Sequence, residues 1–440
     1  MVGEQPPAEG HERARERLVA DLRRRGRIRS EPVAAAFSGV PRHLFLEGLD
    51  PALAYRDDAI PTRWDEAGRP TSSSSQPSIM AIMLEQLEPG PGQRILEVGA
   101  GTGYNAALLG ALTGPQGTVV SVDIDAEVAA AAERHLAAAG AGNVRTLAAD
   151  GAQGSPADAP FDRIIVTAAA WDLAPAWSRQ LAPGGRLVLP LSLRGVQYTV
   201  ALRPMREGFE STSVAACGFM PLRGPSAGPE RIVALGASGL TAELPDDRRR
   251  DGAAVAAWLA EPPTEEVALG IDVTENEIWG SLALWIALGD PEACRLSGFG
   301  EAADTAVAPL IRLPGQSLTH GLLGARGVAA LVAQAPGRSP FALSARGFGP
   351  GGAALAGRLA GLVESWEHRG RPSGEGMRVV AVRPGAPLDD ADAIVDKRHW
   401  RLGVSWKRER GPGGFQDVRC LPCQPPAARA TPGPPVRPSG

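Results

Sequence analysis

Residues 94–104, RILEVGAGTGY, form the stretch that decides the fold of this 440-residue chain. An apolar strand runs into three glycines with GxGxG spacing, and a helix is expected to begin directly after them. Loops that bind a dinucleotide carry GxGxxG and hold a pyrophosphate at the helix N-terminus, but here Tyr104 replaces the third glycine. Glu97 would also repel a pyrophosphate. The loop therefore favours a cationic or hydroxyl-bearing ligand.

Two further carboxylates follow the next two strands. Asp123 ends the second strand, about 20 residues beyond the glycine loop, where a carboxylate can accept hydrogen bonds from ribose hydroxyls. Asp150 follows the third strand and can face an adenine amino group. The nearby Asp125 is better explained as the N-cap of the next helix. With Glu97, these acids favour S-adenosylmethionine, which carries a sulfonium, an ammonium and no phosphate.

Strands and helices alternate on both sides of this loop, which predicts a doubly wound α/β domain. Helices are expected at 11–25, 31–38, 77–87, 104–112, 126–139 and 175–181, and strands at 94–98, 118–122, 144–148, 163–167 and 186–190, with a turn at 183–185. The fold class is therefore α/β: a doubly wound domain with a helical N-terminal segment. After about residue 205 the regular alternation of strands and helices stops, and the later elements indicate an additional C-terminal α/β or α+β domain.

The expected organisation has four parts, and the core should be complete near residue 201. Residues 1–75 form a helical N-terminal segment and a substrate-side loop. Residues 76–205 form the core that binds S-adenosylmethionine. Residues 206–420 form a substrate-recognition domain, and residues 421–440 form a Pro-rich tail that cannot bury enough surface to fold.

Composition excludes several other classes of protein. A net charge of -4 over 440 residues provides no basic field for nucleic acid. No run approaches the roughly 18 apolar residues of a membrane span, and the charged N-terminus lacks a signal sequence. A cytoplasmic protein is expected. Cys217 and Cys294 are expected to be small buried hydrophobes. Cys420 and Cys423 form a CxxC without a second ligand pair, so no metal is expected.

Six ordered motifs resemble the protein-L-isoaspartate (D-aspartate) O-methyltransferase family. They are VPRHLF at 40–45, SQP at 75–77, LEVGAGTGY at 96–104, DG at 150–151, FDRIIVTAA at 161–169 and LAPGGRLVLP at 181–190. The resemblance covers nearly half of the chain. It implies a Rossmann-like class I methyltransferase domain that uses S-adenosylmethionine to esterify the α-carboxylate of isoaspartate in a peptide or protein.

The resemblance also implies roles for individual residues. Ser75 would be the catalytic hydroxyl. The cofactor would lie against Glu97, Gly99, Gly101, Gly103, Asp123 and Asp150, and the substrate against Ser74, Gln76, Thr167, Ala168 and Trp171. Two alternatives stay open: residues 72–74 can be a plain polar linker, and Trp171 can pack against Trp177 or the second domain. A peptide carboxylate is ionised at neutral pH, so no catalytic histidine is required.

The chain departs from the family pattern in three ways. Residues 71–74 are TSSS before the key serine, Ala170-Trp171-Asp172 stands where the family often has proline, and over 200 residues follow the core. These features resemble actinobacterial relatives encoded beside lanthipeptides and graspetides. Those relatives methylate an aspartyl side chain of a ribosomally made peptide, and the ester then closes to aspartimide, which can open to isoaspartate. The alternatives are an isoaspartyl repair enzyme with an extra domain and a non-catalytic peptide-binding protein.

Overall fold

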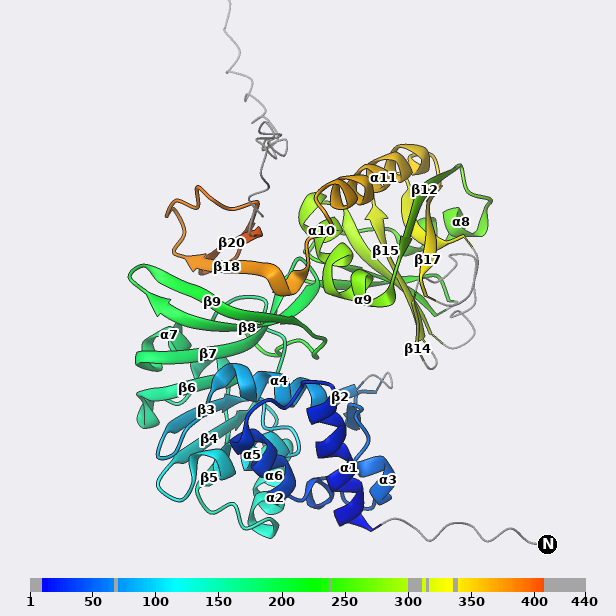
Figure 1. Ribbon diagram of the computed structural model, residues 1–440. Coiled ribbons are helices and arrows are strands. Elements are labelled where there is room, and N and C mark those ends of the chain that lie inside the picture. Colours follow the sequence, from blue (N-terminus) through cyan, green and yellow to red (C-terminus); the bar gives the residue numbers. More distant parts are fainter. Residues whose placement is uncertain are drawn as a thin grey trace, which may run out of the picture. The chain divides into compact units, whose positions relative to one another are not determined.

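The computed structural model describes residues 10–66, 70–237, 239–299, 311–313, 316–334 and 339–406. Their main feature is a ten-stranded mixed sheet in the order β19-β20-β18-β9-β8-β7-β6-β3-β4-β5 (Figure 1). Its strands are β3 (Arg94–Val98), β4 (Thr118–Asp123), β5 (Val144–Ala148), β6 (Phe161–Val166), β7 (Leu181–Leu193), β8 (Val196–Met205), β9 (Gly208–Ala216), β18 (Met377–Val382), β19 (Ala393–Asp396) and β20 (Arg401–Trp406).

The parallel half of this sheet runs from β7 to β5, and every pair from β7 to β19 is antiparallel. Strands β3, β4 and β6 are almost wholly buried, as is typical of parallel strands covered on both faces. The expected Rossmann-like class I methyltransferase fold is confirmed. The turn expected at 183–185 lies inside β7, where Gly184 has a φ of 75° and the register with β6 shifts.

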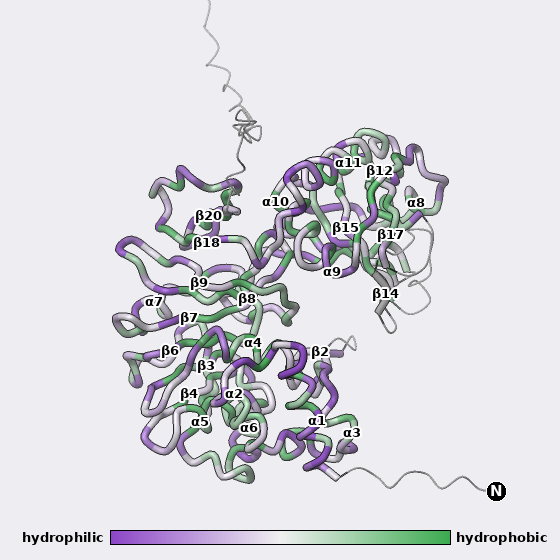
Figure 2. Tube along the Cα trace, in the orientation of Figure 1, coloured by the Kyte–Doolittle hydropathy of each residue, from purple (hydrophilic) through white to green (hydrophobic). Residues whose placement is uncertain are grey.

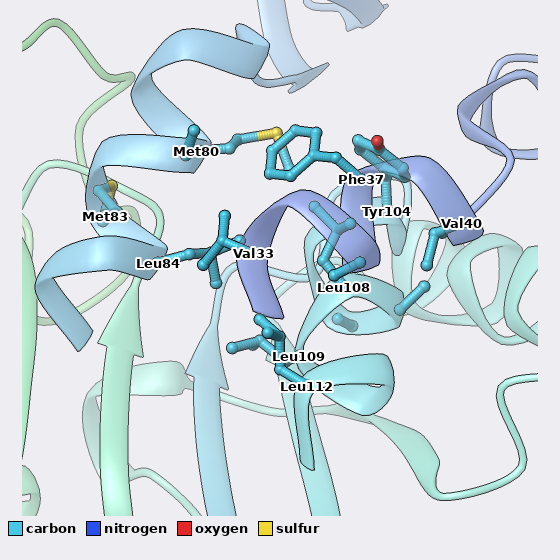
Figure 3. Packing of buried hydrophobic residues seen from close by; sticks show 14 of the residues in the cluster. Val33, Phe37, Val40, Met80, Met83, Leu84, Tyr104, Leu108, Leu109 and Leu112 are labelled. Atoms are coloured by element: carbon cyan, nitrogen blue, oxygen red, sulfur yellow. The ribbon is translucent and has the colours of Figure 1, made fainter. Parts of the chain in front are cut away.

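Helices of the N-terminal half pack on one face of the sheet. They are α1 (His11–Arg24), α2 (Glu31–Gly39), α4 (Pro77–Leu87), α5 (Tyr104–Thr113) and α6 (Ala126–Ala138). Apolar side chains of α2, α4 and α5 interlock there, as Figure 3 shows for Val33, Phe37, Met80, Leu84 and Leu108. The other face is covered in part by α7 (Pro175–Gln180), whose Trp177 is fully buried. These helices occur where the apolar periodicity predicts them.

The segment before Ser75 forms a hairpin rather than the expected loop. Strands β1 (Ile60–Trp64) and β2 (Pro70–Ser74) pair antiparallel, after the short helices η1 (Arg42–Phe45) and α3 (Pro51–Ala54). Pairing with β1, with two register shifts, gives residues 72–74 an extended backbone, and Ser72 and Ser74 are buried. The serines are therefore structured residues, which the polar composition did not reveal.

A second sheet lies in the part of the chain between β9 and β18. It has the order β10-β11-β13-β15-β16-β17-β12, with β14 (Ile311–Leu313) beside β15, and its hydropathy pattern is visible in Figure 2. The strands are β10 (Arg231–Leu235), β11 (Leu240–Leu244), β12 (Glu265–Val273), β13 (Ala293–Phe299), β15 (Gln316–Leu323), β16 (Val328–Ala333) and β17 (Phe341–Phe348). The helices are α8 (Gly252–Ala260), α9 (Glu275–Glu277), the π-helix η4 (Ile278–Leu282), α10 (Ala283–Gly289) and α11 (Gly352–His368). We call residues 217–376 the insertion.

The first sheet does not end near residue 205, where the sequence placed a boundary. Strand β9 extends the core sheet beyond β8, and β18 and β20 then join it from the far side of the insertion. Pairing between residues about 170 positions apart leaves no local mark in a sequence, because strand propensity does not name its partner. The tail at 421–440 and Cys420 lie outside the described residues. Within the described part, no helix is long and apolar enough to cross a membrane.

Candidate active site

An open cleft of about 870 Å³ lies at the carboxyl ends of β3, β4 and β6. Such strand ends are where open α/β sheets bind their ligands. Its lining includes the glycine loop, the strand ends at Asp123 and Thr167, the turn from β2 into α4, and residues at and beyond the end of β9. The cleft therefore has a cofactor side built from the core sheet and a second side built partly by the insertion.

The glycine loop has no room for side chains. Gly99 has a φ of 103° and Gly101 a φ of 52°, a region that side chains disfavour. A Cβ at Gly99 would lie 2.5 Å from Thr167 Oγ1, and one at Gly101 would lie 3.1 Å from the Ser73 carbonyl oxygen. These contacts bring β6, β2 and the loop together around the cleft, and both glycines line it.

Gly103 has a different role from the other two glycines. Its φ of 88° allows the tight turn into α5, and a Cβ there would come within 3.2 Å of the Ala132 carbonyl oxygen of α6. It does not line the cleft, whereas the neighbouring Thr102 and Tyr104 do. Gly103 thus supports helix packing behind the loop.

Asp123 projects its carboxylate into the cleft from the end of β4. One oxygen accepts a hydrogen bond from the Gly101 amide at 3.2 Å and the other from the Asp125 amide at 3.0 Å. These bonds orient the carboxylate at the position expected for a group that accepts from ribose hydroxyls. Asp125 caps α6 through the amides of Glu127 and Val128, as the sequence predicted.

Asp150 lies at the same rim but acts as a cap. Its carboxylate accepts from the Ala152 amide at 3.0 Å, at the start of the 3-10 helix Gly151–Gln153. Gly151 lines the cleft and Asp150 does not. A Cβ at Gly151 would collide with Val98, so the close approach of this turn to β3 also requires glycine.

Glu97 lies behind the cleft and is completely buried. It accepts hydrogen bonds from Asn105 Nδ2 at 2.7 Å and Ser121 Oγ at 2.5 Å. Burial raises the pKa of Glu97 to about 7, although both hydrogen bonds oppose the shift. Asn105 lines the cleft while Glu97 does not. In this structure Glu97 therefore positions Asn105 and the start of α5.

The residues expected on the substrate side converge in the cleft. Ser74, Ser75, Gln76, Thr167 and Ala168 all line it. The Thr167 hydroxyl donates to the Gly99 carbonyl at 2.6 Å, and the Gln76 amide donates to the Asp57 carbonyl at 2.8 Å. The Ser75 hydroxyl has no hydrogen-bond partner among the described residues, so it is free to donate to a bound group.

Trp171 lies apart from this group. It does not line the cleft; the ammonium of Lys397 lies 4.6 Å from its ring centroid, and Gly228 packs closely against it. Burial lowers the pKa of Lys397 to about 8, and its ammonium donates to the Ser192 carbonyl at 2.8 Å. The arrangement matches the packing alternative for Trp171, against residues from beyond the core, and not an aromatic wall of the cleft.

The sequence analysis missed two groups of cleft residues. Asp57 lines the cleft and accepts from the Ser78 amide at 2.8 Å, but its surroundings in the sequence carry no motif. The second group comes from the end of β9 onward. It consists of residues 215–223 together with Asn276, Trp279, Gly280, Ser373 and Glu375. Pairing of β9 with β8 and backbone bonds of Met220 and Leu222 with Ala169 place residues 215–223 there, and the others come from the insertion.

Comparison with known proteins agrees with this site. Residues 13–227 match the family described as Protein-L-isoaspartate(D-aspartate) O-methyltransferase. The protein-L-isoaspartate O-methyltransferase of Methanopyrus kandleri is 41% identical over 214 residues, which are 48% of this chain and 92% of the relative. This chain belongs to the protein-L-isoaspartate(D-aspartate) O-methyltransferase family. It is a methyltransferase that uses S-adenosylmethionine.

Two further comparisons complete the description of this methyltransferase. The protein-L-isoaspartate O-methyltransferase of Hyperthermus butylicus is 40% identical over 220 residues, 48% of this chain and 89% of the relative. A solved protein-L-isoaspartate O-methyltransferase aligns with a TM-score of 0.49 and 22% identity, covering 90% of this chain and 100% of the other. Both sequence relatives match less than half of this chain.

The glycine loop of this methyltransferase can be tested directly. We expect Gly101→Val to abolish binding of S-adenosylmethionine, because the side chain must occupy the cleft or displace Ser73. Calorimetry would measure binding, and circular dichroism would check folding. Gly92→Val is the matched control: Gly92 also has a positive φ, but its Cβ would meet open space. Wild-type affinity in Gly101→Val would contradict the cofactor assignment.

The buried carboxyl of Glu97 predicts a pH-dependent stability. Its pKa is raised on folding, so its contribution to stability is largest at low pH and is lost as the pH rises through about 7. Glu97→Gln should remove this loss. Between pH 5 and 8 the free energy of unfolding of the wild type should therefore fall by about 1–3 kcal/mol relative to that of Glu97→Gln. Urea unfolding without cofactor measures this, with exposed Glu364→Gln as control. Parallel pH profiles for wild type and Glu97→Gln would refute the shift.

Proposed function

We propose that this methyltransferase esterifies an aspartyl side chain of a ribosomally made, cyclised precursor peptide. The observation that supports the proposal is the second side of the cleft: Asn276, Trp279, Ser373 and Glu375 of the insertion line the same cleft as Ser75. The family match ends at residue 227, near the start of the insertion. An added wall at the acceptor side points to a more specific acceptor than isoaspartate in proteins at large.

The site favours positioning over proton transfer. S-adenosylmethionine, when bound, supplies an electrophilic methyl group. A peptide carboxylate has an unperturbed pKa near 4, so it is already the nucleophile at neutral pH and needs no general base. We assign Ser75 as the donor that fixes one carboxylate oxygen while the other attacks, and Thr167 and Ala168 as the neighbouring border. A carbon–oxygen bond forms as the carbon–sulfur bond breaks.

The remaining assignments follow the geometry of the cleft. We propose that Gly99, Gly101 and Asp123 hold the cofactor directly, and that Glu97, Gly103 and Asp150 support the turns around it. Ser74 and Gln76 hold the turn that presents Ser75. Trp171 is placed outside the acceptor site. We propose the insertion, rather than all of 206–420, as the substrate-recognition domain, because the strands after it belong to the core sheet.

A constrained peptide suits a cleft with two walls. A cyclised segment loses little conformational entropy on binding, and a preformed surface on the insertion can reject the linear form. After methyl transfer, the backbone nitrogen of the next residue can attack the ester, release methanol and close an aspartimide. The second candidate, isoaspartyl repair, is favoured by the family of the core and by the names of the relatives.

The Ser75 hydroxyl should determine the rate of methyl transfer and not the affinity for the cofactor. We expect Ser75→Ala to bind S-adenosylmethionine normally and to lower the methyl-transfer rate about 100-fold, the typical effect of losing one positioned donor in a dry site. Ser73→Ala is the matched control, because Ser73 approaches Gly101 through its backbone carbonyl. Normal turnover by Ser75→Ala, together with loss of turnover in Ser73→Ala, would show that Ser73 and not Ser75 is the catalytic serine.

The acceptor is identified by a competition among three peptides. The enzyme is incubated with labelled S-adenosylmethionine and a cyclised aspartyl precursor, its linear form or a generic isoaspartyl peptide. We expect the cyclised precursor to be methylated fastest, and mass spectrometry should show gain of a methyl group followed by loss of methanol. Methylation of the isoaspartyl peptide alone would establish the repair function instead.

A further inference from the structure

An aromatic side chain of the insertion faces the acceptor cleft. Trp279 lies in the π-helix η4, is half-buried and lines the cleft beside Asn276. Single π-turns within helices frequently occur at functional sites, where they change the direction of a side chain. Trp279 therefore offers an aromatic surface on this wall to a bound peptide, as does Phe219, which packs against the core.

Trp279 is held in place by the core sheet and by a buried histidine. The Tyr198 hydroxyl of β8 donates to the Trp279 carbonyl at 3.5 Å. The His320 ring packs edge-on against the indole, with centroids 6.4 Å apart and planes at 86°. Burial lowers the pKa of His320 to about 3, so this ring is neutral. No positive charge from His320 competes for the indole face.

The residue Glu375 lies at the junction where residues 373–375 meet the backbone that carries Trp279. A Cβ on Gly374 would lie 2.5 Å from both the Gly280 carbonyl oxygen and the Tyr198 hydroxyl, so the two segments touch there. Glu375, the next residue, lines the cleft and is exposed. Its negative charge adds to the effect of burial in raising the pKa of Tyr198, which places the carboxylate near that hydroxyl. Glu375 and Trp279 thus flank one junction.

Further bonds make this junction rigid. The Ser281 hydroxyl donates to the Pro372 carbonyl at 2.5 Å and accepts from Trp366 Nε1 at 2.6 Å. Arg371 pairs with Glu277 at 2.7 Å, which satisfies that carboxylate. Glu375, by contrast, has no ion-pair partner among the described residues. An unpaired carboxylate that lines the same cleft as Trp279 is available to a ligand.

We propose that Trp279 and Glu375, with Asn276, form a specificity subsite for a lysine or arginine side chain of the acceptor peptide. A cation over an indole face gains from the ring quadrupole, and a carboxylate adds a charge-assisted hydrogen bond. The inference rests on the proposed function, in that the cleft receives a peptide. It goes further by specifying that a basic residue should lie near the methylated aspartate of the peptide.

Positive charges line other parts of the cleft, so the sign of the charge differs between those parts and the part that contains Glu375. Arg25 is paired with Asp21 at 2.8 Å, and Arg223 lies 4.0 Å from the Asp123 carboxylate. Arg27, in the turn after α1, is exposed and also lines the cleft. An acidic side chain of the peptide would be drawn toward these arginines and away from Glu375. The subsite therefore distinguishes basic from acidic neighbours of the acceptor.

The test uses three cyclised peptides that differ at one position near the acceptor aspartate: lysine, glutamine or glutamate. We expect kcat/KM to favour lysine over glutamate by about tenfold in the wild type. Trp279→Leu and Glu375→Gln should each reduce this ratio severalfold, Trp279→Phe should keep most of it, and Glu375→Arg should invert it. Glu364→Gln, an exposed acid on α11, is the control and should leave the ratio unchanged.

A binding measurement separates this inference from the proposed function. Peptides with asparagine in place of the acceptor aspartate are titrated into the full-length enzyme with S-adenosylhomocysteine. Lysine preference in this binding measurement, together with no methylation of any aspartyl peptide in the kinetic test, would refute the proposed function and keep the subsite. Equal binding of the lysine and glutamate peptides, or a preference unchanged in Glu375→Arg, would overturn the subsite. Glu375→Arg and Trp279→Phe keep the test valid if Trp279→Leu fails to fold.

Discussion

The site depends on how closely three backbone segments approach one another at the glycine loop. Gly99 lies against Thr167 at the end of β6, and Gly101 lies against the Ser73 carbonyl of β2. Any side chain at either position would push the segments apart. This contact places the cofactor side and the acceptor side of the cleft within reach of each other, so one steric constraint serves both substrates of the reaction.

A buried arginine keeps the acceptor turn against that loop. Arg42 is fully buried, and its guanidinium donates to the carbonyls of Asp58 and Ser75 and lies near Ser74 Oγ. Its charge faces the Tyr104 ring at 5.6 Å. Burial lowers the pKa of Arg42 without neutralising it. Carbonyl oxygens and an aromatic face stabilise a buried cation, so the turn with Ser75 is tied to the N-terminal segment.

The insertion changes what the core can recognise without changing how the core is built. It leaves the sheet after β9 and returns at β18, so both of its ends are anchored in neighbouring strands. Anchoring at two points fixes η4 and residues 373–375 beside the cleft. The fold thereby adds a second wall to a site whose chemistry lies in the first half of the chain.

The sequence by itself determined the parts whose causes are local. Glycine spacing predicted the loop at 99–103, apolar periodicity predicted α4, α5 and α6, and motif content predicted the family. These features depend on neighbours along the chain, which a sequence displays. The roles assigned to Asp123 and Ser75 followed from their places at a strand end and in a motif.

Only the tertiary structure decided the non-local features. It paired β9 with β18, formed the hairpin that orders residues 72–74, left Trp171 outside the lining of the cleft and brought Trp279 and Glu375 into it. It also buried Glu97 behind the site, which changed a presumed ligand into a support for Asn105. The physical reason is the same in each case: burial and strand pairing join residues far apart in the chain, and no local pattern encodes the partner.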